Sequence, residues 1–298
     1  MMRNRHSSVV GPGGQTGIFG PRWVESAGRL GIAALAAMLL AAPAGSQAPA
    51  ADSLAINGEL PPAVPSGKPS EILPPVASPF RPGEVLRFSV QYGPIHAGSA
   101  WLEVHGPGPG DSSTVETLVA RAESNSFFSL TYRVRNRIES SWDARERRSL
   151  RYREDRHEGG FKAKSEIVFN QDQGEARYSD GRVFPIPPGV QDALSSFYFT
   201  RTQALPIGGS VLFDYHASGR SQPLEVRIIG RDRVHVPAGT FDCIVVEPVL
   251  HAGGIFKNNG RLLIWMTSDA RRIPVLMKSK VAIGSISVVL QQLTAGAG

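Results

Sequence analysis

The chain has 298 residues, of which 41% are apolar and 19% are charged, so it holds enough apolar material for a folded core of one or two domains. Its single cysteine excludes an intramolecular disulfide and every Cys-x-x-Cys metal or redox motif. The 32 glycines and 23 prolines predict turn-rich β structure or low-complexity segments.

The first segment, residues 1–44, is predicted to be a secretory signal peptide. Residues 30–42 form an uncharged apolar run that follows Arg22 and Arg29. This run is shorter than the roughly 20 residues of a membrane-spanning helix, and Ala42-Pro43-Ala44 fits the small-x-small cleavage pattern. Cleavage predicts a periplasmic or secreted protein, and an uncleaved N-terminal membrane anchor is the alternative.

Residues 45–79 are predicted to form a disordered tether rich in proline and alanine. Nine prolines fall between positions 43 and 80. Such a stretch buries too little apolar surface to offset the entropy of the chain, and its prolines favour an extended conformation. The tether is either a passive linker or a spacer that holds the following domain away from a membrane.

Residues 80–294 are predicted to form one antiparallel β domain, because apolar and polar residues alternate through most of it. In 85–92, for example, Leu86, Phe88 and Val90 share one face. Regularly spaced strands with turn residues between them favour an all-β, mostly antiparallel curved sheet, either a half-barrel or barrel-like. The predicted strands are 85–92, 95–105, 115–123, 131–142, 150–157, 161–169, 209–216, 223–236, 241–250, 261–267, 274–282 and 284–293.

One segment departs from the strand period. In 190–202, Val190, Leu194, Phe197 and Arg201 recur at helical spacing, and a Pro-Pro-Gly sequence precedes them. This pattern predicts one short helix that packs its aromatic residues against the sheet.

Four stretches together resemble the bacterial family called domain of unknown function 3108. They are residues 80–98 (FRPGEVLRFSVQYGPIHAG), 191–201 (QDALSSFYFTR), 236–241 (VPAGTF) and 264–275 (IWMTSDARRIPV). The resemblance implies an exported protein without an assigned activity, and it supplies no catalytic residues. By analogy of fold alone, it implies a curved half-barrel that binds lipids or lipoproteins. The matching positions, which we interpret as structural, are Gly98, Asp192, Arg201, Gly239, Asp269 and Arg272.

The sequence contains no motif for catalysis, a cofactor or a metal. The seven histidines form neither His-x-His nor His-Glu-x-x-His, and no Gly-x-Ser-x-Gly nucleophile motif is present. Cys243 lies on an apolar strand, which predicts a buried, unreactive thiol. We therefore expect no cofactor and favour a non-enzymatic protein, with a hydrolase whose Ser, His and Asp are dispersed in the sequence as an alternative.

Two features could bind a partner. Arg133, Arg135 and Arg137 project from one face of a predicted strand and suit phosphate or carboxylate groups, unless acids on the next strand neutralise them. Half of the net charge of +6 lies in residues 1–44, so nucleic acid is not an expected partner.

A set of aromatic residues could line a cavity inside the curved sheet: Phe88, Tyr132, Trp142, Phe169, Phe197, Tyr198 and Trp265.

These features favour an envelope-associated protein that binds an apolar or lipidic ligand, or that touches a membrane surface. A protein–protein adaptor in envelope assembly is the second hypothesis, since a sheet edge or the arginine face could hold another protein.

Overall fold

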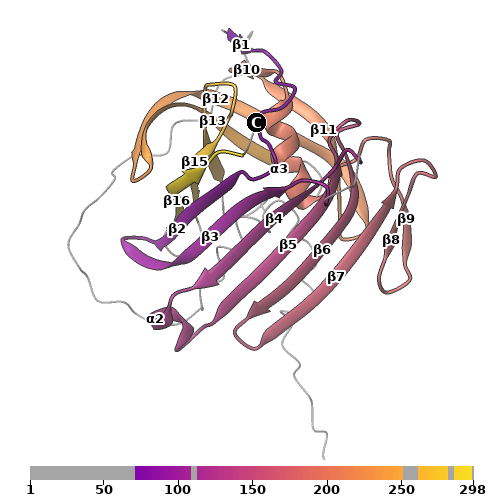
Figure 1. Ribbon diagram of the computed structural model, residues 1–298, viewed down its shortest axis with the longest axis horizontal. Coiled ribbons are helices and arrows are strands. Elements are labelled where there is room, and N and C mark those ends of the chain that lie inside the picture. Colours follow the sequence, from indigo (N-terminus) through magenta and orange to yellow (C-terminus); the bar gives the residue numbers. More distant parts are fainter. Residues whose placement is uncertain (1–70, 109–112, 251–260, 281–284, 297–298) are drawn as a thin grey trace, which may run out of the picture.

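One large, strongly curved antiparallel sheet wraps around a ten-residue helix (Figure 1). The computed structural model describes residues 71–108, 113–250, 261–280 and 285–296. The elements are β1 (Glu71–Leu73), β2 (Val85–Tyr92), β3 (Ile95–His105), β4 (Val115–Ser124), α2 (Ser126–Ser129), β5 (Val134–Asp143), β6 (Arg148–Glu158), β7 (Phe161–Asn170), β8 (Glu175–Tyr178), β9 (Val183–Pro185), α3 (Ala193–Thr202), β10 (Leu205–Ile207), β11 (Ser210–Ala217), β12 (Arg220–Val236), β13 (Gly239–Leu250), β14 (Leu262–Thr267), β15 (Pro274–Lys280) and β16 (Ser285–Thr294). The predicted fold class is confirmed.

The strand order explains the place of the helix. The 14-stranded sheet runs from β11 to β16 in chain order and continues from β2 to β9, because β16 pairs antiparallel with β2. The two edges of the sheet, β9 and β11, are therefore close in sequence, and α3 belongs to the connection between them. This connection carries α3 into the inside of the curved sheet (Figure 1), where most of the helix residues are buried.

The two edges approach each other at one end without a continuous hydrogen-bonded ladder. The Tyr178 hydroxyl lies 3.0 Å from Nε2 of His216 and accepts a hydrogen bond from the amide of Gly219 at 2.7 Å. Gln191, just before α3, makes an isolated parallel bridge to Tyr215 on β11. Side chains and the Gln191 segment thus fill the seam, and the sheet is barrel-like but not closed.

Gly98 occupies a position that only glycine fits. The pairing of β2 with β3 shifts register beside it, between Val90 and Gln91. A Cβ atom on Gly98 would collide with the carbonyl oxygen of Glu123 on β4. The bulge or close approach that the sequence predicts here is present.

The structure differs from the expectation in several places. Three short strands, β8, β9 and β10, are additional to the predicted ones. Helix α2 was not predicted; it lies inside the connection to β5, so that strand begins at Val134 rather than 131. Residues 71–79, the end of the predicted tether, lie on the domain, since β1 pairs with β10 and Leu73 is buried. The predicted signal peptide (1–44) and the first part of the tether (45–70) lie outside the described residues.

Candidate functional site

The N-terminal end of α3 is fixed by a buried carboxylate. Asp192 is the N-cap, and its Oδ1 accepts the amides of Leu194 and Ser195, both at 2.8 Å. Its Oδ2 accepts the hydroxyl of Ser140 on β5 at 2.5 Å and that of Ser149 on β6 at 2.9 Å. Burial raises the pKa of Asp192, and these hydrogen bonds oppose the shift. The network ties the helix to two strands of the sheet.

The C-terminal end of α3 carries a buried ion pair. Arg201 has no exposed side-chain surface, and its guanidinium donates to both carboxylate oxygens of Glu84 at 2.7 and 2.9 Å. The same guanidinium lies 4.9 Å from the ring centre of Phe80 and 5.4 Å from that of Tyr198. Arg201 therefore attaches the helix to the chain that enters β2.

A second buried arginine caps the same end of the helix. Arg272 donates hydrogen bonds to the carbonyl oxygens of Arg201, Gln203 and Pro74. Burial lowers its pKa, yet the negative end of the helix dipole favours a cation at this place. Because Pro74 precedes the helix by more than a hundred residues, Arg272 also holds residues 71–79 onto the domain.

The turn before Arg272 presents that side chain to the helix. Asp269 accepts the hydroxyl of Thr267 at 2.6 Å and the amide and guanidinium of Arg271. Its pKa is lowered, because the hydrogen bonds from Thr267 and Arg271 outweigh the opposite effect of burial. Arg272 then adopts a positive φ of 47°, a strained conformation for a side chain of this size.

Four of the six motif positions thus serve one purpose, which is to hold α3 inside the sheet: Asp192, Arg201, Asp269 and Arg272. Gly239 is the first residue of β13, directly after the β12–β13 turn, with a φ of 138°, and it is far from the helix in the chain. Glu84, the partner of Arg201, was not predicted; its only signal in the sequence is its place in the first stretch that resembles the family.

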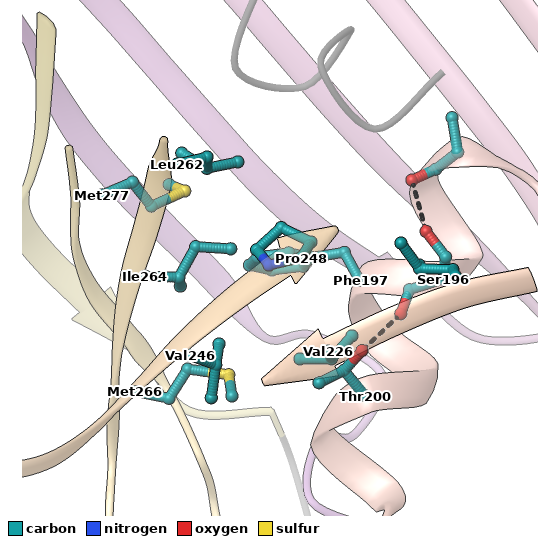
Figure 2. A pocket seen from close by; sticks show the side chains of 12 residues that line it. Ser196, Phe197, Thr200, Val226, Val246, Pro248, Leu262, Ile264, Met266 and Met277 are labelled. Carbon is teal, nitrogen blue, oxygen red and sulfur yellow. Dashed lines mark hydrogen bonds between the residues drawn. The ribbon is translucent and has the colours of Figure 1, made fainter. Parts of the chain in front are cut away.

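Beneath α3 lies an apolar cleft between the helix and four strands of the sheet (Figure 2). The helix contributes Phe197 to the lining. The hydroxyls of Ser196 and Thr200 also lie there, but they donate hydrogen bonds to backbone carbonyls of the helix at 3.0 and 2.9 Å. The surface of the cleft therefore consists almost entirely of hydrocarbon and thioether groups. Its lining is Ala193, Ser196, Phe197, Thr200, Leu224, Val226, Val246, Pro248, Leu262, Ile264, Met266 and Met277.

The cleft is small in this structure. Its volume is about 30 Å³, which holds about two water molecules. Met266 and Met277, which line its sheet side in Figure 2, are unbranched and change rotamer more easily than branched side chains. Occupation by a larger apolar group requires these flexible side chains to move.

The structure brings only one of the predicted lining aromatics to this cleft, namely Phe197. Trp142 and Tyr198 instead pack around Phe80, with ring centres 5.6 and 4.9 Å from it. Trp265 alternates with the cleft-lining residues of β14, so it lies on the other face, where its indole donates to Asp232 at 2.7 Å.

The other aromatic residues predicted to line a cavity lie outside the cleft. Phe88 is a buried core residue of β2, and Phe169 packs against His216 with ring centres 5.8 Å apart. Tyr132 is partly buried beside Gly159. Sequence reasoning missed Met266 on β14 and Met277 on β15, because the apolar patterns of these strands do not show which face meets the helix; every residue of β14, for example, is buried.

The three arginines predicted to contact an anion are all exposed: Arg133 directly before β5, and Arg135 and Arg137 on it. Arg137 forms an ion pair with Glu139 at 2.6 Å on its own strand. Over the part of the chain described by the structure, no ion pair engages Arg133 or Arg135. Arg133 and Arg135, which lie closer to α2 in the chain than Arg137 does, therefore have guanidinium groups that can contact another molecule.

No Ser-His-Asp set is assembled within the ranges that the structure covers. Ser221 lies 2.9 Å from Nδ1 of His216, but the other ring nitrogen faces the hydroxyl of Tyr178 instead of a carboxylate. Burial raises the pKa of the Cys243 thiol to about 12, so this sulfur is not a nucleophile near neutral pH. The described residues contain no cluster of three His, Cys, Asp or Glu suited to a metal, and neither of their helices is long and apolar enough to cross a bilayer.

Comparisons with known proteins match the chain to one family model, described as Protein of unknown function (DUF3108), over residues 87–291. No curated protein matches. A β-barrel-like protein of another domain of unknown function, DUF1849, from Brucella abortus is similar with a TM-score of 0.49 and 9% identity, over 72% of this chain and 98% of that one. A structure named "putative lipoprotein" from Parabacteroides distasonis gives a TM-score of 0.32 and 10% identity, over 74% and 99% of the two chains.

Proposed function

The chain belongs to the family Protein of unknown function (DUF3108), and from this premise we propose that it is a non-enzymatic protein of the bacterial cell envelope that binds an apolar, lipid-like ligand beneath α3. The apolar cleft is the observation that carries the proposal. The predicted signal peptide over residues 1–44 supports the location.

The chemistry of the cleft favours an acyl chain over a polar ligand. Its two helix hydroxyls, on Ser196 and Thr200, already donate to carbonyls of the helix, and the other lining residues have apolar side chains. A polar ligand would lose its hydrogen bonds to water there without replacement. An acyl chain loses none and gains about 0.8 kcal/mol for each buried CH₂ group.

The rigid frame and the flexible floor of the cleft fit this function. Buried charges fix both ends of α3, so the helix stays in place when the cleft changes volume. Met266 and Met277 supply the adaptable surface. Ligand binding then repacks side chains and does not need to open the sheet.

A fluorescent long-chain fatty acid tests the proposal. Val226→Phe places a phenyl ring in the cleft, and we expect at least a tenfold loss of affinity for the probe by fluorescence titration. Leu212→Phe is the matched control, because Leu212 is 65% exposed on the neighbouring strand β11. Met277→Ala enlarges the cleft and should keep or increase the affinity.

Thermal unfolding of each variant separates a blocked cleft from an unfolded protein. If the folded Val226→Phe variant binds the fatty acid as well as the original protein does, or if the original protein binds none, the cleft is not a lipid site.

A further inference from the structure

A short apolar tip lies far from the cleft, on the connection between β4 and β5. Helix α2 has the sequence Ser-Phe-Phe-Ser, and none of its four residues is buried. Phe127 is 71% exposed and Leu130, directly after the helix, is 84% exposed. Ile95, at the start of β3, is 42% exposed. We call Ile95, Phe127 and Leu130 the apolar tip.

Hydrogen bonds hold the apolar tip in a defined shape. Asn125 caps α2 by accepting the amide of Phe128 at 2.9 Å. The side-chain amide of Asn125 donates to the carbonyl of His96 at 2.6 Å, which joins α2 to the β2–β3 turn next to Ile95. The hydroxyls of Ser124 and Ser129 lie 2.7 Å apart across the base of the turn. Helix α2 lies at the end of β4, away from α3 (Figure 1), and these hydrogen bonds fix the turn that carries the exposed side chains.

Cationic side chains lie next to the apolar tip. Arg133 is the fourth residue after the end of α2, and Arg135 pairs in register with His157, which in turn pairs with Lys162. Arg133, Arg135 and Lys162 are exposed, and the structure records no ion pair for them among the residues it describes. We call these three residues the basic collar. The nearby acids that reach the surface are Glu123, opposite Arg135 on β4, and Asp155 on β6, which forms an ion pair with Lys164 at 2.9 Å. The three cations of the collar therefore face only one carboxylate for which the described residues show no ion pair, and the collar remains net positive.

We propose that the apolar tip inserts into the interfacial layer of an anionic lipid membrane while the basic collar contacts the lipid headgroups. Shallow insertion of a few apolar side chains together with several cations is a known physical basis for reversible membrane binding. Three side chains give far less than the roughly 800 Å² per partner that a stable protein interface buries. A lipid surface therefore fits this tip better than another protein does.

Vesicle co-sedimentation of the full chain tests the tip. We expect binding to vesicles of phosphatidylcholine and phosphatidylglycerol, and much weaker binding to phosphatidylcholine alone. The double variant Phe127→Ser with Leu130→Ser should lower the partition coefficient at least tenfold. Arg133→Gln with Arg135→Gln should lower it by about tenfold or more on the anionic vesicles, because each cation near the surface contributes to the attraction.

Matched variants elsewhere on the surface provide the controls. Leu212→Ser removes an exposed apolar side chain, and Arg145→Gln with Arg220→Gln removes two exposed cations away from the tip. All variants keep the same N-terminal segment, so its own affinity for lipid cancels in the comparison. Equal binding of tip variants and controls would overturn the proposal, and so would an original protein that binds neither type of vesicle.

A fluorescent label gives a second readout that does not depend on the loss of binding. The only native cysteine, Cys243, is buried, so Leu130→Cys can be labelled selectively with an environment-sensitive dye. The emission should shift to the blue on anionic vesicles, whereas the same dye at Leu212→Cys should not respond. A dye at position 130 that stays in water while the protein sediments with vesicles contradicts insertion. Neither result depends on a ligand in the cleft beneath α3.

Discussion

At the scale of single residues, charged side chains inside the domain determine how it holds together. Arg272 is the extreme case, since its side chain is buried and every acceptor that the described structure gives it is a backbone carbonyl. A buried cation needs such acceptors, because burial removes it from water. The three carbonyls belong to the end of α3 and to the segment before β2, so one side chain joins two distant parts of the chain.

Replacing Arg272 by alanine should therefore destabilise the protein. The variant leaves the carbonyls of Arg201, Gln203 and Pro74 without this donor, and we expect a loss of about 3 kcal/mol in the free energy of unfolding. Urea denaturation measures it. The neighbouring Arg271 is half-exposed and pairs with Asp269 at the surface, so Arg271→Ala should cost less than about 1 kcal/mol. Equal losses in the two variants would contradict the role assigned to Arg272.

At the scale of elements, α3 is a helix that the protein positions from both ends. Its own sequence has a weak apolar face, since serine, threonine and arginine residues are buried along it. Polar contacts with Ser140, Ser149 and Glu84 replace part of the usual apolar packing. The position of the helix, and with it the cleft, therefore depends on specific hydrogen bonds more than on burial alone.

Removal of the N-cap should loosen this end of the helix. Asp192→Ala deletes four acceptor contacts and leaves the hydroxyls of Ser140 and Ser149 without their carboxylate. We expect a loss of about 2–4 kcal/mol in unfolding free energy and faster hydrogen exchange of the amides of Leu194 and Ser195. Thr202→Ala, at the other end of α3, is the control for the exchange measurement. Unchanged protection at Leu194 would show that the cap is dispensable.

The sequence predicts α3 well because its signals are local. A Pro-Pro-Gly start, helical spacing and Asp192 lie within one short segment, and the helix begins at Ala193 and ends at Thr202. The same reasoning missed α2, because a helix of four residues is too short for helical spacing to show. Exposure is a tertiary property, and the pattern of residues 126–130 does not contain it.

At the scale of the whole molecule, the seam between β9 and β11 is the place where the curved sheet comes near to closing. His216 is buried there between the hydroxyls of Tyr178 and Ser221, at 3.0 and 2.9 Å. The ring also packs against Phe169 and Phe184. Burial lowers the pKa of His216 to about 4, so the neutral ring fits the seam and the protonated ring does not.

The seam should therefore weaken in acid. The unfolded chain binds a proton on His216 near pH 6.5, but the folded chain does so only near pH 4, so this contribution to stability is complete above about pH 6.5 and falls between those values. We expect a loss of roughly 2–3 kcal/mol over that window. His216→Gln cannot titrate, so its unfolding free energy should depend less steeply on pH. Parallel pH profiles of the two proteins would show that His216 is not the responsible group.

The sequence by itself determined the long strands of the large sheet, helix α3 and the arginines that alternate along β5, because period-two alternation and turn residues act over a few neighbouring positions. Tertiary structure alone decided which residues meet at the cleft. In β14 every residue is buried, so alternation gives two faces and does not say that Ile264 and Met266 meet the helix while Trp265 lies opposite. The strand order and the buried ends of α3 make that choice, since they set which face of the sheet turns inward.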